Sequence, residues 1–327
     1  MKFIDLKNFK SIKNLKVGLI GYGIQGRACA LNLRDSKIKV HVHQIKDKYL
    51  KDLKKDKFKN YDIRNLVEKC EVIIILVPDA SHKDITNKIA RYTKTQKKLI
   101  VLPSGFACTF EKIKNTKNIK FFLISPRYPG QIIRQNYLNK VDTLGFYGSV
   151  DRSTTDEKNK ILTVAKAWGM KKLFVTTMKE EANIDLFIEN FLIPRIMGTI
   201  EETYNAMIKS GIQDHIAMLE AYQSGEIIGL FQKGLSMGMF NSFHKHTSPT
   251  CQFAVSDKYN LINKNVPKIT KSIINEIKNK KFYFKLKKQL QNSYKSKNQF
   301  NNKKLNSKFT KTQRKLINFF SNNKIIY

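Results

Sequence analysis

The sequence predicts an α/β domain followed by an all-helical domain. Short apolar runs alternate with helical stretches over the first half of the chain, a glycine-rich turn follows the first of these runs, and only helical periodicity remains after about Thr177. Alternation of strands and helices is typical of a parallel sheet covered by helices on both faces. We therefore expect the first domain to span residues 1–177 and the second to span residues 178–327.

The strands expected in the first domain are short apolar runs. They are Val17–Ile20, Ile38–Val42, Val72–Val77, Leu99–Leu102, Phe121–Ile124, Thr143–Tyr147 and Lys172–Val175. The segments between them that we expect to form helices or turns are Gln25–Arg34, Ile63–Lys69, His82–Arg91, Phe110–Ile113 and Glu157–Trp168.

Long stretches of helical period characterise the second domain. They are Glu180–Lys209, Ile212–Lys233 and Val266–Lys280. The tail from about Asn292 is rich in Lys, Asn, Ser and Gln, which is typical of poorly ordered segments, although Lys315–Phe320 has the pattern of a last helix.

The net charge is extreme, because 61 Lys and Arg residues face 26 Asp and Glu residues, which gives +35. Such a field attracts anions, including nucleic acid and anionic membranes. The excess is mostly Lys and is spread along the whole chain rather than along one stripe. We therefore expect anionic substrates and cofactors, and we do not expect nucleic acid binding to be the main function.

The sequence also indicates in which cellular compartment we expect the protein. No apolar run approaches the roughly 20 residues that span a bilayer, and the N-terminus has no pattern of a signal peptide. The four cysteines are scattered without a CxxC pair, which argues against a disulfide framework and a thiolate metal site. These observations predict a cytoplasmic protein.

The turn after the first strand has the spacing GxGxxG. In that pattern Gly21 permits a tight turn, Gly23 lets the backbone approach a pyrophosphate, and Gly26 allows close packing of helix on strand. The helix that follows offers free amide groups to the anion. This order of strand, turn and helix predicts a Rossmann domain that binds a dinucleotide. The residues expected to bind it are Gly21, Tyr22, Gly23, Ile24, Gln25 and Gly26.

The end of the second strand predicts which dinucleotide is used. An acidic residue there would bond the ribose 2′-hydroxyl of NAD. The segment His41–Ile45 contains none, and Lys46 and Lys48 follow it. Two lysines favour the 2′-phosphate of NADP, so we expect NADPH, with NADH as the alternative.

These motifs resemble those of the ketol-acid reductoisomerases, also called acetohydroxy-acid isomeroreductases. The resemblance covers nearly the whole chain, at the length of the short form of that family. The segments that carry it are Gly21–Gly26, Ala30–Ser36, Val77–Asp79, Ser104–Phe106, Pro126–Gly130, Asp185–Glu189, Ser248–Thr250 and Ile273–Phe282.

The resemblance implies an enzyme that isomerises 2-acetolactate by alkyl migration and reduces the product with NADPH in branched-chain amino-acid synthesis. It implies a knotted helical domain, and dimers that share an active site. It also implies two magnesium ions, because a divalent cation stabilises the charge that develops on the substrate oxygens. Asp79 and Gly130 would lie among the cofactor-binding residues.

Carboxylates are the expected magnesium ligands. Asp185 and Glu189 are four residues apart, so they share one helix face within an apolar run. In the resembling family a second helix supplies two glutamates four residues apart, and these positions fall on Glu220 and Ser224. The match also assigns substrate binding to Ser248, although a serine before a proline is also common in plain turns.

Three positions at the expected reaction centre depart from the family pattern. Ser104 replaces a catalytic histidine, Arg127 replaces a lysine near the metals, and Ser224 replaces the second glutamate. A serine does not titrate near neutral pH, and an arginine does not readily give up a proton. Ser224 removes a carboxylate, which weakens the second metal site.

The substitutions leave alternatives open, since the dinucleotide turn is intact while the reaction centre is altered. The leading hypothesis is a reductoisomerase that uses Ser104, Arg127, Asp185 and Glu189 in catalysis. The alternatives are a diverged paralogue that reduces a 2-keto acid without metal, and a non-catalytic nucleotide-binding protein. A homodimer or higher homo-oligomer is expected in the leading case.

Overall fold

The chain forms two compact units, Met1–Ile184 and Asp185–Tyr327. The structure is a computed structural model that describes residues 1–45, 47–93 and 95–322. The expected cofactor residue Lys46 therefore lies outside the described residues.

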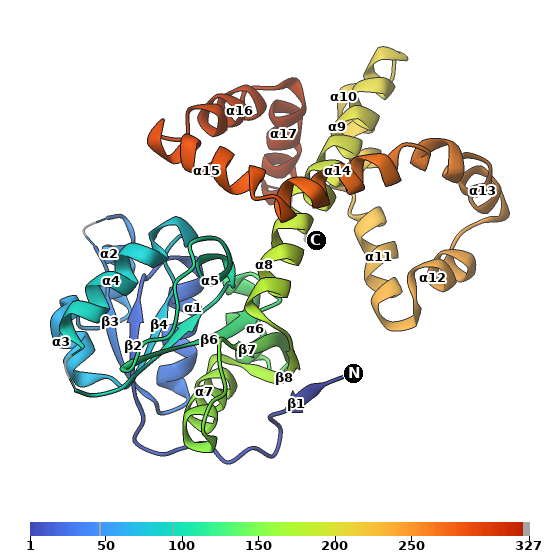
Figure 1. Cartoon of the computed structure of the whole chain (residues 1–327). Coiled ribbons are helices and arrows are strands. Elements are labelled where there is room, and N and C mark those ends of the chain that lie inside the picture. Colours follow the sequence, from blue (N-terminus) through green and yellow to red (C-terminus); the bar gives the residue numbers. More distant parts are fainter. Residues whose placement is uncertain (46, 94, 323–327) are drawn as a thin grey trace. The chain divides into compact units, whose positions relative to one another are not determined.

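The first unit is built on one sheet of eight strands in the order β1-β8-β7-β6-β5-β4-β2-β3 (Figure 1). The strands are β1 (Phe3–Asp5), β2 (Lys16–Ile20), β3 (Lys39–His43), β4 (Val72–Ile75), β5 (Lys98–Leu102), β6 (Ile119–Pro126), β7 (Thr143–Ser149) and β8 (Met170–Val175). All seven strands expected from apolar runs are present, and β1 is an addition that the sequence pattern did not indicate.

The expected parallel sheet is present, but two of its strand pairs are antiparallel. Strands β3, β2, β4, β5 and β6 are parallel, as in a Rossmann domain, but β7 is antiparallel to β6, and β1 is antiparallel to β8. Gly145 of β7 pairs with Pro126, so the chain returns beside the same end of β6 at which it left. An apolar run indicates burial but carries no strand direction, which the connection sets.

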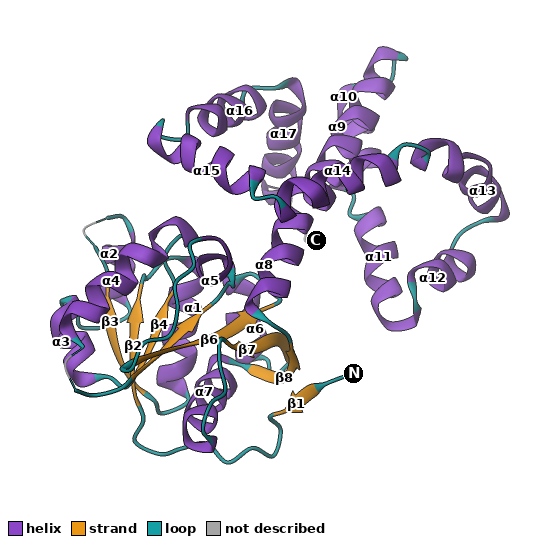
Figure 2. Ribbon diagram, in the orientation of Figure 1, coloured by secondary structure: helices purple, strands orange, loops and turns teal. Residues whose placement is uncertain are grey.

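Side chains alternate between two cores on opposite faces of the sheet, because successive residues of a strand point to opposite sides. Leu19 and Ile74 belong to one core, and Ile73 and Ile75 belong to the other. The first core is covered by α1 (Ile24–Asp35) and α7 (Thr155–Trp168), and the second by α3 (Ile63–Lys69) and α4 (His82–Tyr92). Figure 2 shows these helices on the sheet.

The shorter helices of this unit are α2 (Tyr49–Lys55), α5 (Phe106–Phe110) and α6 (Gly130–Leu138). The segment Phe110–Ile113 is not a helix, because α5 ends at its first residue and Lys112 has a left-handed φ of 56°. The helix instead begins directly after Gly105, four residues earlier than the apolar pattern indicated.

The second unit contains only helices in its described part (Figure 2). They include η2 (Ile188–Leu192), α9 (Ile193–Lys209), α10 (Asp214–Met218), η3 (Leu219–Gln223), α11 (Glu226–Met237), α12 (Met239–His246), α13 (Pro249–Asn263), α14 (Val266–Lys278), α15 (Lys281–Gln291), α16 (Lys295–Leu305) and α17 (Lys308–Asn322). Before η2, α8 (Met178–Phe187) joins the two units. Within the described ranges, no helix is long and apolar enough to cross a membrane.

Two expectations for this unit need adjustment. The stretch Ile212–Lys233 is not one helix, because Gly225 adopts a left-handed φ of 78° and separates η3 from α11. The tail after Asn292 forms α16 and α17, and α17 contains the expected helix Lys315–Phe320.

Glu157 anchors the start of α7 to the sheet. The Thr154 hydroxyl and the Glu157 carboxylate form a reciprocal capping box at the helix start. The same carboxylate pairs with Lys97 at 2.6 Å and with Lys120 at 2.8 Å. Burial alone would raise the pKa of Glu157, but hydrogen bonds from Lys120, Lys97 and the Thr154 amide lower it to about 2.

We expect Glu157→Gln to destabilise the protein by roughly 1–3 kcal/mol at neutral pH, since a carboxylate with a lowered pKa stabilises the fold only while it is ionised. The difference in free energy of unfolding between variant and wild type should have its full size above pH 4.5, the ordinary pKa of the group. It should decrease as the pH approaches about 2. Urea unfolding at a series of pH values measures it. The exposed Glu68→Gln is the control, with an expected loss below about 0.5 kcal/mol. A difference that does not vary with pH would contradict this account.

Candidate functional site

The glycine turn between β2 and α1 is closely packed at its first and third glycines. Gly21 has a left-handed φ of +100°, and a Cβ there would lie 2.5 Å from the carbonyl oxygen of Leu76. A Cβ on Gly26 would lie 1.9 Å from the carbonyl oxygen of Gly21. Contacts this short exclude any side chain, so these two glycines set the path of the turn and the approach of α1 to β2.

The second glycine of the turn is open instead. The nearest atom to a Cβ on Gly23 would be Cε2 of Tyr49, at 3.9 Å. The Arg27 amide donates to the Gly23 carbonyl, so the amides of Ile24, Gln25 and Gly26 precede the first hydrogen bond of the helix. No acidic residue lies in this first turn of α1. Free amides beside open space are an arrangement that can bind a phosphate anion.

Gly130 packs directly on this turn. A Cβ there would lie 2.6 Å from the carbonyl oxygen of Ile24 and 2.8 Å from the Cα of Gln25. Gly130 is the first residue of α6, so the amino ends of α1 and α6 meet at the expected cofactor turn. The structure thus brings Gly130 to the place that the resemblance implies.

Tyr22 stabilises the turn from its core side. Its ring is fully buried, its amide donates to the Gln44 side chain, and its hydroxyl donates to Asp56 at 2.9 Å. Arg27 donates to both oxygens of Asp56, from Nε at 2.6 Å and from Nη2 at 3.0 Å. Burial, together with the Asp56 carboxylate, raises the pKa of the Tyr22 phenol, so the hydroxyl remains a donor. The side chain of Tyr22 therefore shapes the turn from the core.

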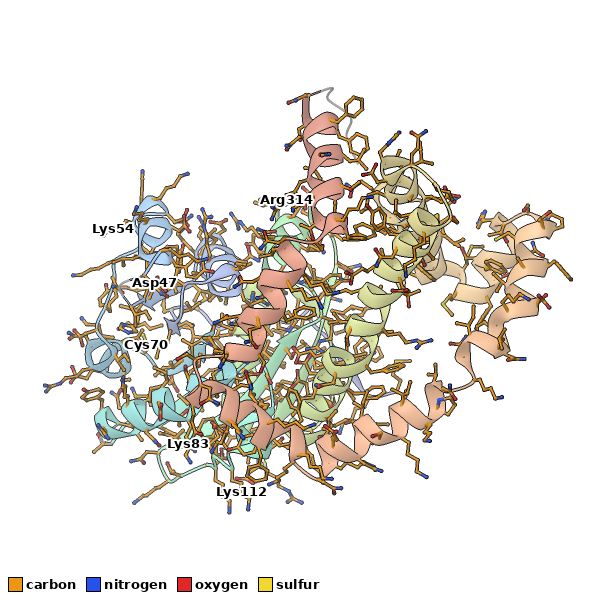
Figure 3. All side chains as sticks on the ribbon, turned by 90° about the horizontal axis from the view of Figure 1, so that it is seen from above. Asp47, Lys54, Cys70, Lys83, Lys112 and Arg314 are labelled. Carbon is orange, nitrogen blue, oxygen red and sulfur yellow. The ribbon has the colours of Figure 1, made fainter. Side chains whose placement is uncertain are left out.

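The segment after β3 carries an acid that sequence reasoning passed over. Asp47, which Figure 3 labels, lies between the two lysines expected to select the cofactor. Its carboxylate accepts hydrogen bonds from Gln44 Nε2 at 2.8 Å and from the Tyr49 amide at 2.9 Å. The Lys48 ammonium lies 4.9 Å from the centre of the Tyr49 ring. An acid and a lysine therefore both follow β3. In Rossmann domains the residues at this place contact the ribose of the dinucleotide.

Asp79 follows β4 in the short helix η1 (Asp79–Ser81). Its carboxylate lies 3.6 Å from Nδ1 of His82, and Nε2 of His82 lies 2.9 Å from the carbonyl oxygen of Val77. Burial lowers the pKa of His82 to about 4, so the imidazole is neutral at physiological pH. This neutral ring fixes the loop at the carboxyl end of β4, where Rossmann domains bind their ligands.

A buried carboxylate, Glu181, joins three parts of the first unit. Glu181 lies on α8 and is fully buried. It accepts hydrogen bonds from the Gly105 amide at 2.7 Å and from the Ser125 hydroxyl at 2.7 Å. The Arg127 guanidinium pairs with the same carboxylate at 3.1 Å. A Cβ on Gly105 would lie 1.9 Å from the carbonyl oxygen of Met178, so the two segments are in direct contact.

Glu181 brings together two of the residues expected to act in catalysis. Ser104 is next to Gly105 in the chain, is 8% exposed, and accepts a hydrogen bond from the Phe106 amide at 3.1 Å. Arg127 also donates to the Ser125 hydroxyl and stacks 4.5 Å from the centre of the Phe146 ring. Sequence reasoning missed Glu181, although its place one helical turn before Asp185 is a signal for it.

Two of the four expected magnesium ligands lie in helical segments of unusual winding, whereas Asp185 lies in α8 and Ser224 directly follows η3. Glu189 belongs to η2 and Glu220 belongs to η3, and both segments are π-helical. Fewer than about 1% of residues are π-helical, and such turns occur often at functional sites. Glu220 and Ser224 are exposed. Among residues 1–45, 47–93 and 95–322, however, no group of three His, Cys, Asp or Glu residues is arranged to hold a metal ion.

Ser248 caps a helix in the structure. It is the N-cap of α13, and its hydroxyl accepts a hydrogen bond from the Cys251 amide at 3.3 Å. A serine at this position is a preferred helix cap. The capping role accounts for Ser248 locally, and its assignment to substrate binding stays a prediction.

We expect Glu181→Gln to destabilise the protein by about 2–4 kcal/mol, because the amide replaces one of two oxygens that accept from three donors and removes the negative charge that pairs with Arg127. Urea unfolding at pH 7 measures the loss. The exposed neighbour variant Glu180→Gln is the control and should lose less than about 1 kcal/mol. Equal losses in the two variants would show that Glu181 has no special role.

The structural comparison supports the architecture. An NADH-preferring ketol-acid reductoisomerase from an uncultured archean superposes with a TM-score of 0.90 at 20% identity, covering 98% of this chain and 99% of that one. A semialdehyde dehydrogenase NAD-binding protein from Cupriavidus necator gives a TM-score of 0.63 at 17% identity, over 81% of this chain and 99% of the other. These matches confirm the predicted fold class.

Sequence comparisons identify the family. The acetohydroxy acid isomeroreductase NADPH-binding domain matches residues 11–173, and the ketol-acid reductoisomerase C-terminal domain matches residues 178–322. A ketol-acid reductoisomerase (NADP(+)) from Helicobacter acinonychis (strain Sheeba) is 31% identical over 278 residues, covering 81% of this chain and 82% of that protein. One from Sulfurisphaera tokodaii is 31% identical over 281 residues, covering 83% of this chain and 82% of that protein. The chain therefore belongs to the ketol-acid reductoisomerase family.

Proposed function

We propose that this protein is an NAD(P)H-dependent ketol-acid reductoisomerase of branched-chain amino-acid synthesis. It would isomerise 2-acetolactate-type acids by alkyl migration and reduce the product. The observation that carries the proposal is the coexistence of an open glycine turn with a buried Glu181 that positions the Ser104 loop and Arg127. Family membership over both domains supports it.

The proposal assigns separate roles to the two parts of the chain. Residues 1–177 would bind the cofactor, and residues 178–327 would bind metal and substrate, in the cytoplasm. A knot in the helical domain stays an expectation from the family resemblance.

The choice between NADPH and NADH depends on the segment after β3. Lys46 and Lys48 favour NADPH, because an ammonium group pairs with the 2′-phosphate. Asp47 is the group that would favour NADH, and its bonds to Gln44 and Tyr49 hold it away from that role. We therefore propose NADPH as the preferred cofactor, with NADH as a slower substitute.

In this mechanism the first turn of α1 holds the pyrophosphate through the amides of Ile24, Gln25 and Gly26. The bound dinucleotide supplies the hydride for the reduction step. Arg127, which is 31% exposed and fixed by Glu181, would orient the anionic substrate through its guanidinium. Ser104 would hydrogen-bond a substrate oxygen, since a hydroxyl donates and accepts without changing charge.

Magnesium would be held by Asp185, Glu189 and Glu220. When bound, it would stabilise the negative charge that develops on the substrate oxygens. Carboxylates suit this ion, but the described part of one chain brings no three candidate ligands together. We therefore propose that the site is completed in a homodimer, in which the second copy supplies Glu220. Ser224 would contribute no charge, so we propose that one of the two ions binds weakly.

Exposed apolar side chains of the second unit support a homodimer. Leu235 on α11 is 89% exposed, and Phe253 on α13 is 71% exposed. Further large apolar side chains with high exposure lie on the same helices. Large apolar patches on a soluble protein mark surfaces that a partner covers. A second copy of the chain is the partner that the family resemblance implies.

A second candidate function is a metal-independent reductase of a 2-keto acid. The substitutions at Ser104, Arg127 and Ser224 favour it, because all three fall at the expected reaction centre while the dinucleotide turn is intact. In this reading Asp185 and Glu189 have no catalytic role.

We expect the purified protein to oxidise NADPH when 2-acetolactate and magnesium are both present. Asp185→Asn should reduce kcat at least 100-fold, because one ligand of the metal loses its charge, and EDTA should abolish the activity. Asp142→Asn, which changes an exposed acid just before β7 in the first unit, is the matched control and should retain wild-type kcat. Absence of activity in correctly folded wild type would contradict the proposal, and activity that survives EDTA would favour the second candidate.

We expect Gly23→Ala to fold normally and to bind NADPH at least tenfold more weakly, because its methyl group meets no protein atom closer than 3.9 Å and projects toward the bound pyrophosphate. Gly26→Ala should instead lose at least about 2 kcal/mol of stability through its clash with backbone. Thermal unfolding and fluorescence titration with NADPH separate the two effects. Unchanged affinity in Gly23→Ala would place the dinucleotide elsewhere.

A further inference from the structure

A cavity of about 260 Å³ opens at the amino-terminal edge of the sheet in the first unit. Lys16, the first residue of β2, lines it together with Glu71, which precedes β4, and Gln96, which precedes β5. The glycine turn follows the opposite end of β2. Five residues of strand, or about 16 Å, separate the two places. The cavity is therefore distinct from the proposed cofactor site.

The lining of this cavity is strongly basic. Lys13, Lys16, Lys69 and Lys160 surround it, with Glu71 as the acid among the lining residues. Glu71 pairs with Lys160, and Asp156 pairs with the same lysine at 2.7 Å. In the described ranges, Lys13, Lys16 and Lys69 have no ion-pair partner. The four lysines carry four positive charges against the two negative charges of Glu71 and Asp156, so the cavity region keeps a net charge of +2.

A buried lysine behind the cavity adds to this charge and fixes a polar group in the lining. Lys98 is 2% exposed, and its ammonium donates to the carbonyl oxygen of Cys70 at 2.9 Å and to Oε1 of Gln96 at 3.3 Å. Cys70, labelled in Figure 3, marks the end of α3 at this edge of the sheet. An ammonium can only donate, so the oxygen of Gln96 faces Lys98, and its NH₂ group remains to donate to a ligand.

We propose that this cavity binds a small, multiply charged oxyanion of the phosphate class, such as pyrophosphate or a phosphorylated metabolite. The net charge of +2, to which the buried Lys98 adds one, exceeds the charge of a monocarboxylate and matches a phosphate that carries several charges. Lysine binds phosphate as a point charge, and the Gln96 amide adds a directional donor. The volume is slightly below the roughly 300–1,000 Å³ of ordinary small-molecule sites, which favours a small anion over a nucleotide.

The expected consequence is a more stable first unit when the anion is bound. The ligand would offset the mutual repulsion of Lys13, Lys16 and Lys69, and a ligand that binds only the folded state raises the unfolding temperature. The cavity residues precede β2, β4 and β5, whose far ends carry the loops of the cofactor turn and Asp79. An anion here would therefore stiffen the strands that position the cofactor site.

The test is calorimetric titration of the full chain with pyrophosphate, at low ionic strength and with saturating NADPH so that the cofactor's own phosphate site is filled. We expect binding to persist under these conditions and to weaken at least tenfold in Lys16→Gln/Lys69→Gln. The control Lys114→Gln/Lys117→Gln removes the same charge from exposed positions elsewhere and should change affinity less than twofold.

Several results would overturn the proposal. They are loss of pyrophosphate binding once NADPH is present, equal weakening in the two double variants, and binding of a short RNA but not of pyrophosphate. Because Lys16 begins a core strand, Lys13→Gln is a second variant on the preceding loop, and it should weaken binding at least threefold while the circular dichroism spectrum is unchanged. The titration needs no reductoisomerase activity, so it stands or fails separately from the proposed function.

Discussion

The contact between Gly26 and the carbonyl oxygen of Gly21 is the constraint on which the first unit depends. A Cβ at Gly26 would lie 1.9 Å from that oxygen, so α1 packs on β2 only because position 26 has no side chain. From this position α1 sends Cys29 and Leu33 into the core on one face of the sheet. Gly130 then packs on the same turn, so the start of α6 is fixed by the same close approach. A geometry that leaves amides exposed at a helix start is also what a pyrophosphate requires.

A second constraint positions two of the residues expected at the reaction centre, Ser104 and Arg127. The buried carboxylate of Glu181 needs donors, because an ion removed from water is stable only when it is paired and hydrogen-bonded. The Gly105 amide, the Ser125 hydroxyl and Arg127 supply them. The Ser104 loop and Arg127 are therefore held in place by electrostatics.

Local patterns made most of the first unit predictable. The strands and the glycine turn follow from short-range periodicity and from the steric demands of single residues, and the structure confirms them. The antiparallel direction of β7 and the hydrogen bonds that converge on Glu181 were not predictable, because each depends on segments far apart in the chain. The basic cavity was not predictable for a different reason. Lysines are so frequent in the sequence that Lys16 and Lys69 form no recognisable pattern, and only the fold brings them together. The metal ligands stay a prediction, since the described residues of one chain do not bring three candidate ligands together.

Hydrogen exchange of the backbone amides, with and without NADPH, tests the central claim most directly. The account predicts that NADPH slows exchange at Ile24, Gln25 and Gly26, since these amides precede the first hydrogen bond of α1 and would donate to the pyrophosphate. Amides of α3, on the opposite face of the sheet, should change little. Protection that is absent from residues 24–26 but present elsewhere in the chain would contradict the account.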